Sequence, residues 1–117
     1  MYKLAAVFSF LAAPVLATGL QIEVAGEGAN GVITVDLLED VAPNHVAHIA
    51  ALAADGIYDN VVFHRVIDGF MAQTGDVQYG KAGGATSRAG MGGSDKPDLK
   101  AEFSEVPYDR GIVGMAR

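Results

Sequence analysis

The sequence contains no cysteine and no tryptophan, and it is poor in basic residues. Without cysteine there is no disulfide framework, no thiolate nucleophile and no cysteine-based zinc site. The 8 Lys and Arg residues stand against 14 Asp and Glu residues, which gives a net charge of −6. Phosphate binding needs a basic surface, so nucleic acid is excluded as an expected partner. What remains is an acidic chain of 117 residues, half of them apolar, which is enough for one packed domain.

Apolar residues are concentrated at the start of the chain. Residues 1–17 include 14 apolar side chains and a single charge, Lys3. A basic residue near the start, an apolar run and small residues up to Ala17 are typical of a secretory signal peptide. The run is shorter than the ~20 residues that cross a bilayer, which argues against a membrane anchor. We therefore expect cleavage after Ala17, and residues 18–117 to form one exported domain that has no contact with the membrane.

The first part of this domain is predicted to form a hairpin followed by a helix. Apolar and polar residues alternate over 20–24 and 32–38, and the glycine-rich segment 26–31 between them is typical of a turn. Pro43 suits the first turn of a helix, and Gly56 suits the position just after its end. The helix has an apolar stripe at the spacing of a buried face, made of Val46, Ile49, Ala50 and Ala53.

The second part is predicted to be mostly strand and loop. Residues 61–67 are rich in β-branched side chains, Asp68-Gly69 indicates a turn, and residues 71–74 form the returning strand. Residues 80–93 include 6 glycines and form a long irregular loop. Short strands are expected at Phe103 and at 112–115. One helix among β-hairpins indicates a mainly β fold, either a β-barrel or an α+β sheet with a capping helix.

The hairpin around Asp68-Gly69 has two possible registers. A two-residue turn would place Arg65 opposite Ala72, and the Asp-Gly pair favours this shorter connection. A three-residue loop would place Arg65 opposite Gln73. Since side chains alternate along a strand, only the longer loop puts Arg65, Gln73 and Met71 on one face. The sequence leaves both registers open.

Metal and cofactor sites are not indicated. His45 and His48 have an i, i+3 spacing that could suit a metal, but no carboxylate lies at ligand spacing within their segment. A solvated helix face is therefore the expected setting for both histidines. The glycine-rich loop lacks the GxxxxGK[ST] pattern of a phosphate-binding loop.

Two stretches of sequence carry a family resemblance: FHRVIDGFMAQTGD at 63–76 and RGIVGMAR at 110–117. With them, the chain from residue 20 onward closely resembles the cyclophilin family of peptidyl-prolyl cis-trans isomerases, particularly its bacterial secreted members. The resemblance implies a mainly β fold, a closed antiparallel barrel of eight strands with a capping helix. The chain is expected to supply roughly the N-terminal two-thirds of that barrel, without its last strands.

The resemblance also implies an activity and a set of site residues. The activity is isomerisation of X–Pro bonds in polypeptide substrates, which would assist the folding of exported proteins, with the bacterial periplasm as the expected location. Arg65 matches the catalytic residue, whose guanidinium is directed at the prolyl group. The residues that match substrate-binding positions are His64, Phe70, Met71, Gln73, Ala116 and Arg117. The chemistry implied needs no cofactor and no metal.

Two other functions fit the same resemblance. The domain could be a non-catalytic module that binds proline-containing peptides, or an inactive partial chain. Arg65 discriminates the first of these from the enzyme, because a module that only binds peptide does not need the cation.

Overall fold

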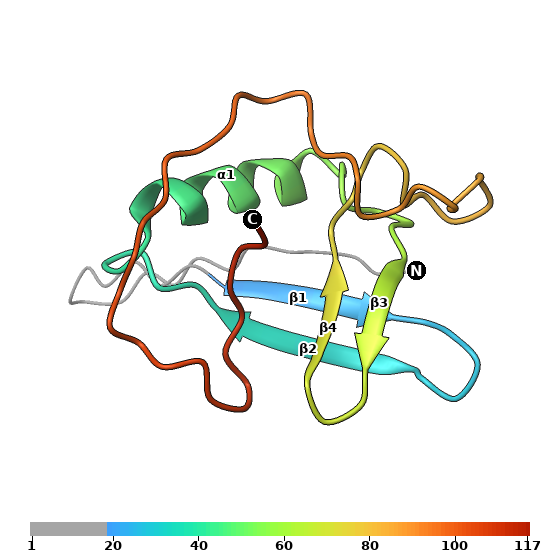
Figure 1. Ribbon diagram of the computed structural model, residues 1–117, viewed down its shortest axis with the longest axis horizontal. Helices are drawn as coiled ribbons and strands as arrows, with labels where there is room; N and C mark the ends of the chain where they lie inside the picture. The colour runs from blue at the N-terminus through green and yellow to red at the C-terminus, as the bar shows by residue number, and fades with distance from the viewer. Residues whose placement is uncertain (1–18) are drawn as a thin grey trace, which may run out of the picture.

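The computed structural model describes residues 19–117, and its first element is the predicted hairpin. Strand β1, Gly19–Val24, pairs antiparallel with β2, Gly31–Asp36 (Figure 1). Leu20 lies opposite Val35, and Ile22 lies opposite Ile33. The alternation places these apolar side chains on one face of the hairpin, as predicted. The signal peptide predicted for 1–17 lies outside the described residues.

Helix α1, Pro43–Ala54, begins and ends where the sequence predicts. Pro43 occupies the first turn, where its missing N–H has no intrahelical partner to lose. Gly56, at φ +72°, takes the left-handed conformation that lets the chain turn away after the helix. Within the predicted stripe Val46 and Ala53 are buried, and Leu52, which is not in that stripe, is 3% exposed.

The core forms between α1 and the β1–β2 hairpin, which run side by side in Figure 1. Leu20 from β1 meets Leu52 and Ala53 from α1, and Tyr58 and Val61 complete the buried cluster. Partly buried side chains surround it, namely Ile22, Val24, Val35, Leu37, Ile49, Phe63 and Val77. This packing fixes the segment that leads from α1 into the next strand, because Val61 is fully buried just before that strand begins.

The second hairpin consists of β3, Phe63–Ile67, and β4, Met71–Thr74. It crosses the direction of the first hairpin in the view of Figure 1. Within residues 19–117 the two hairpins are separate two-stranded sheets, and no strand joins them into a closed barrel. The mainly β fold with one helix is confirmed, and its barrel is incomplete over these residues.

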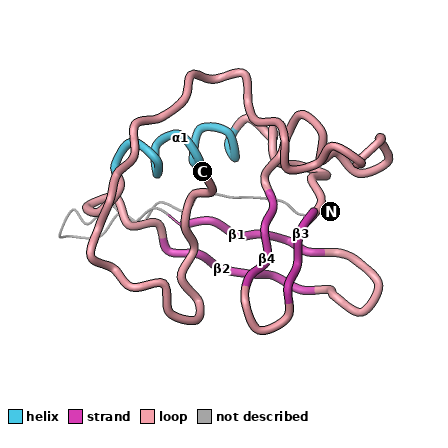
Figure 2. Tube along the Cα trace, in the orientation of Figure 1, coloured by secondary structure: helices cyan, strands magenta, loops and turns pink. Residues whose placement is uncertain are grey.

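The part of the chain after β4 is loop throughout (Figure 2). The short strands predicted at Phe103 and 112–115 are therefore wrong for the described structure. Phe103 is 79% exposed and Val113 is 69% exposed. A strand needs a neighbouring ladder to satisfy its backbone N–H and C=O groups, and nothing in residues 19–117 pairs with these segments. None of the described helices has the length and apolar character needed to cross a membrane.

Candidate functional site

The β3–β4 hairpin adopts the longer of the two registers. Ile67 pairs with Met71 and Arg65 pairs with Gln73, so the connection is the three-residue loop 68–70. The Phe70 amide donates to the Ile67 carbonyl oxygen at 3.0 Å, closing a four-residue turn. Gly69 sits third in that turn with φ +75°, as a type II turn requires, which a side chain would strain. Asp68 lacks the positive φ that a two-residue type I′ turn would need at its first central position, so the structure adopts the longer of the two registers that the sequence leaves open.

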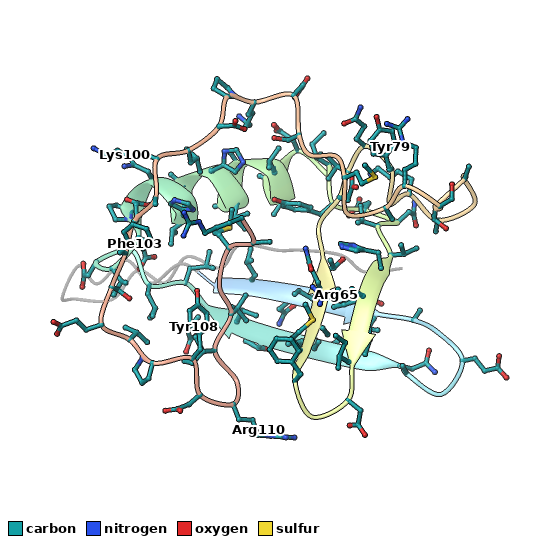
Figure 3. The ribbon with its side chains drawn as sticks, in the orientation of Figure 1. Arg65, Tyr79, Lys100, Phe103, Tyr108 and Arg110 are labelled. Carbon is teal, nitrogen blue, oxygen red and sulfur yellow. The ribbon has the colours of Figure 1, made fainter. Side chains whose placement is uncertain are left out.

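This register gathers three of the predicted site residues on one face of the hairpin. Arg65 and Gln73 are direct partners across the strands, and Met71 follows on the same face. Met71 and Gln73 are half-buried, whereas Arg65 is exposed near the middle of the hairpin (Figure 3). The Arg65 side chain makes no hydrogen bond or ion pair with any other residue in 19–117. Its N–H donors are consequently available to a ligand.

Phe70 lies apart from this face. It is the last residue of the connecting loop and its side chain is 73% exposed. The structure therefore brings Met71 beside Arg65 but leaves Phe70 at the hairpin tip. Its predicted contact with a prolyl ring stays a prediction.

His64 is the extra residue of a β-bulge. Phe63 pairs with Thr74 and Arg65 with Gln73, so His64 has no direct partner on β4. The imidazole is half-buried, and its Nδ1 is buried without a hydrogen-bond partner among residues 19–117. Its Nε2 lies only 3.0 Å from the place that a Cβ on Gly90 would occupy. The ring thus lies against the glycine-rich loop, and its predicted contact with substrate stays a prediction.

The glycine-rich loop is held by Asp76, a residue that the sequence analysis did not single out. Its Oδ1 accepts from the amides of Gln78 at 3.0 Å and Tyr79 at 2.9 Å. Its Oδ2 accepts from the amides of Gly90 at 2.7 Å and Gly92 at 2.9 Å. Asp76 is 4% exposed; burial alone would raise the pKa of its carboxyl, but the four amide donors outweigh burial and lower it.

The signal for Asp76 in the sequence is weak. An Asp that directly precedes a turn often accepts from backbone amides two and three residues on, which accounts for Gln78 and Tyr79. The contacts to Gly90 and Gly92, 14 and 16 residues away, have no local pattern.

Ala116 and Arg117 are placed in the exposed loop at the end of the chain (Figure 1). The Arg117 guanidinium carbon lies 5.6 Å from the centre of the Phe103 ring, a cation–π contact. No hydrogen bond or ion pair joins either residue to the β3–β4 hairpin within the described part of the chain. The structure does not bring them to Arg65, and their role in binding substrate stays a prediction.

The two helical histidines do not form a metal site in residues 19–117, where no group of three potential ligands comes together. His45 is not solvated as expected: its side chain is 15% exposed, and its Nε2 lies 2.9 Å from the Lys100 carbonyl oxygen. Glu102 accepts from the His45 amide at 2.7 Å and from the Asn44 amide at 3.2 Å. Burial raises the pKa of the Glu102 carboxyl, but these amides and the nearby imidazole outweigh burial and lower it.

Comparison with known proteins shows the family to which the chain belongs. The family model described as "Cyclophilin type peptidyl-prolyl cis-trans isomerase/CLD" matches residues 20–117. A "Probable peptidyl-prolyl cis-trans isomerase" of Brucella suis is 54% identical over 90 residues, which cover 75% of this chain and 46% of the relative. A "Peptidyl-prolyl cis-trans isomerase" of Synechococcus elongatus is 36% identical over 90 residues, covering 77% of this chain and 55% of the relative. No solved structure matches.

The chain belongs to the cyclophilin-type peptidyl-prolyl cis-trans isomerase family, because the family model covers nearly all of the described residues. It spans about half the length of the curated relatives that it matches. The FHRVI and GFMAQTGD segments that carry the resemblance form one hairpin, so the family's sequence pattern coincides with the face that holds Arg65.

Proposed function

We propose that the whole protein is a peptidyl-prolyl cis-trans isomerase acting on X–Pro bonds in polypeptides. The observation that supports this most directly is the Arg65 guanidinium, set opposite Gln73, beside Met71 and without an internal partner among residues 19–117. An exposed arginine on a strand is commonly solvated, so the proposal rests on the position of Arg65 on one face with Gln73 and Met71, inside the segment that carries the family resemblance. Here the donors are left for a substrate.

The chemistry follows from the peptide bond. Partial double-bond character makes the uncatalysed X–Pro exchange slow, so any interaction that weakens the resonance lowers the barrier. A guanidinium N–H donated to the prolyl nitrogen would stabilise that nitrogen when it becomes pyramidal in the twisted transition state. The planar peptide offers no such lone pair, so the interaction is stronger in the transition state and raises the rate.

The neighbours of Arg65 have complementary tasks. The amide of Gln73 can both donate to and accept from substrate backbone, which would fix the peptide across the hairpin. Met71 offers an adaptable apolar contact for the proline ring. Neither task involves a proton transfer, a covalent intermediate or a metal.

The cellular location of the protein is also part of the proposal. Residues 1–17 have the sequence of a signal peptide, which supports export and, for a protein resembling bacterial secreted members, the periplasm. The clients would then be exported polypeptides whose folding waits on X–Pro isomerisation. Mass spectrometry of protein recovered from the periplasm should show Thr18 as the first residue; recovery of the uncleaved chain from the cytoplasm would contradict export.

The isomerase proposal is tested with Arg65→Ala and Arg65→Lys in a protease-coupled assay of a proline-containing peptide. Removing a donor that acts in the transition state should lower kcat/KM about 100-fold, with peptide affinity largely kept. Lysine should rescue only part of the rate, because it lacks the planar guanidinium. Arg110→Ala, an exposed arginine with no contact to the hairpin, is the matched control and should retain the wild-type rate.

The competing function gives a different result. If the protein is a non-catalytic peptide-binding module, neither the wild type nor Arg65→Ala would show a rate above the uncatalysed exchange, while both would still bind the peptide. Equal rates for wild type and Arg65→Ala would overturn the role assigned to this side chain.

A further inference from the structure

A second feature lies next to the Arg65 hairpin and has no part in the proposal above. Asp76 follows β4 by two residues, and its carboxylate holds both ends of the loop from Gln78 to Gly92. Four backbone amides converge on two oxygens, with donor–acceptor distances from 2.7 to 3.0 Å. Because its pKa is lowered, the carboxylate is ionised at neutral pH, and all four hydrogen bonds are charge-assisted.

The loop that Asp76 holds packs against the imidazole of His64. The Gly90 amide donates to Asp76 Oδ2, and the same glycine faces the imidazole. A Cβ placed on Gly90 would lie 3.0 Å from His64 Nε2 and 3.1 Å from His64 Cδ2. A side chain at these separations would make the ring shift by a few tenths of an ångström, so glycine lets the loop backbone pack on the ring without displacing it.

His64 lies within β3, directly before Arg65. It is the extra residue of the bulge between the Phe63–Thr74 pair and the Arg65–Gln73 pair. A bulge re-aims the side chains that follow it, so the direction of Arg65 depends on how the bulged residue is packed. The imidazole of His64 extends from the bulge, and Gly90 covers it on the side of the loop.

We propose that Asp76 is a positioning residue of the isomerase site: by anchoring Gly90 and Gly92 it holds the loop against His64, which fixes the bulge and aims Arg65 across the hairpin. The fall in catalytic rate that this inference predicts rests on the proposed function. Its geometric consequence, the packing of the loop on His64, does not depend on catalysis.

The first variant is Asp76→Asn in the whole protein. The side chain keeps its size, but one of its two acceptor positions becomes an NH₂ donor that faces amide donors. One end of the loop should detach. We expect kcat to fall about tenfold with KM little changed, because misplacement of a catalytic group by a fraction of an ångström acts on the transition state.

The second variant, Gly90→Ala, leaves Asp76 intact and displaces His64 directly. Gly83→Ala is its matched control, since Gly83 also has a positive φ, +85° against +100° at Gly90, but its Cβ would meet nothing within 4 Å. Gly93→Ala lacks both the strained φ and the contact. We expect Gly90→Ala to lose activity beyond Gly83→Ala, and Gly93→Ala to keep the wild-type rate.

Two readouts separate this inference from the proposed function. NMR signals of the His64 ring and the Arg65 Nε–H should shift in Asp76→Asn and Gly90→Ala but stay in place in Gly83→Ala and Gly93→Ala. If the wild type shows no rate above the uncatalysed exchange, the proposed function fails, while the NMR shifts still decide whether the loop positions His64 and Arg65. Unchanged Arg65 signals in Gly90→Ala, or a loss of kcat no greater than that of Gly83→Ala, would overturn the role of Asp76, even where Asp76→Asn fails to fold.

Discussion

At the scale of single residues, Asp76 shows how one buried carboxylate can order a loop that has no regular structure. Residues 80–93 include six glycines, whose backbone loses more freedom on folding than that of any other residue. Their amides need acceptors, and no strand or helix supplies them in this segment. Asp76 supplies acceptors at both ends of the loop, so the charge of this one side chain should contribute measurably to the stability of the fold.

The pH dependence of stability tests this directly. The pKa of Asp76 is lowered from its ordinary value of 3.8 in the folded state, so the unfolded chain binds the proton more readily. The stability due to Asp76 is therefore complete at neutral pH and is lost as the pH falls below about 4. Urea unfolding should show wild type more stable than Asp76→Asn at pH 7 by about 2 kcal/mol, the order expected for lost hydrogen bonds to a charge.

The same measurement at pH 3 should bring wild type and Asp76→Asn closer together. The control is Asp98→Asn, which removes the charge of an exposed carboxylate that accepts no hydrogen bond in the described structure. Its stability should follow that of wild type at both pH values. A gap between wild type and Asp76→Asn that is as wide at pH 3 as at pH 7 would show that ionisation of Asp76 does not stabilise the fold.

Individual residues of the site could be predicted from the sequence to different degrees. Arg65, Met71 and Gln73 were placed on one face by strand alternation, on condition that the loop had three residues. The condition itself could not be settled, because Asp68-Gly69 fits a two-residue turn as well as a longer one. The register is decided by the backbone conformation of Asp68, which does not have the positive φ of a type I′ turn, and this is a property of the folded chain. Asp76 and Glu102 are not predicted, because half of the amide partners of Asp76 and both amide partners of Glu102 lie 14 or more residues away in sequence.

At the scale of elements, helix α1 depends on a cap from outside its own segment. Ala42, at the N-cap, has no side-chain oxygen, and the first turn contains no acidic residue. Glu102 caps the helix instead. Its carboxylate accepts from the amides of Asn44 and His45, which lie more than 50 residues earlier in the chain. A carboxylate at a helix N-terminus also interacts favourably with the helix dipole. The contact ties the loop after β4 to the helix that completes the core.

Replacing the Glu102 carboxylate should therefore destabilise both helix α1 and the loop after β4. Glu102→Gln keeps the length of the side chain but removes its charge and one acceptor oxygen. We expect the melting temperature to fall by about 4 °C, the order of a lost helix cap in a domain of this size. Differential scanning calorimetry at pH 7 measures it, and Glu105→Gln, exposed and without a partner in the described structure, should leave the transition unchanged. A fall of the same size in both variants would assign the effect to net charge and not to the cap.

At the scale of the whole molecule, residues 105–117 are a loop whose side chains are almost all exposed. Tyr108 and Val113 are 78% and 69% exposed, and Ile112 and Met115 are also exposed. The sequence predicts a short strand at 112–115, where Ile112 and Val113 are β-branched. The prediction required a partner strand, and a local pattern cannot say whether a partner is present. The chain spans about half the length of its curated relatives, so such a partner would lie in a region that they have in addition.

Hydrogen exchange of the backbone amides can test whether these residues are a strand waiting for its partner. In a polypeptide of residues 18–117, the amides of 112–115 should exchange at almost the unprotected rate, since no described strand pairs with them. Fusing that polypeptide to the part of the Brucella suis relative that lies outside the matched 90 residues should slow their exchange about 100-fold or more. The amides of Ile22 and Val35, already within the β1–β2 ladder, are the internal control and should be protected in both polypeptides. Equal exchange of 112–115 with and without the added segment would mean that this stretch is also a loop in the longer polypeptide. Its apolar side chains would then lie on the surface and not in the interior of a barrel.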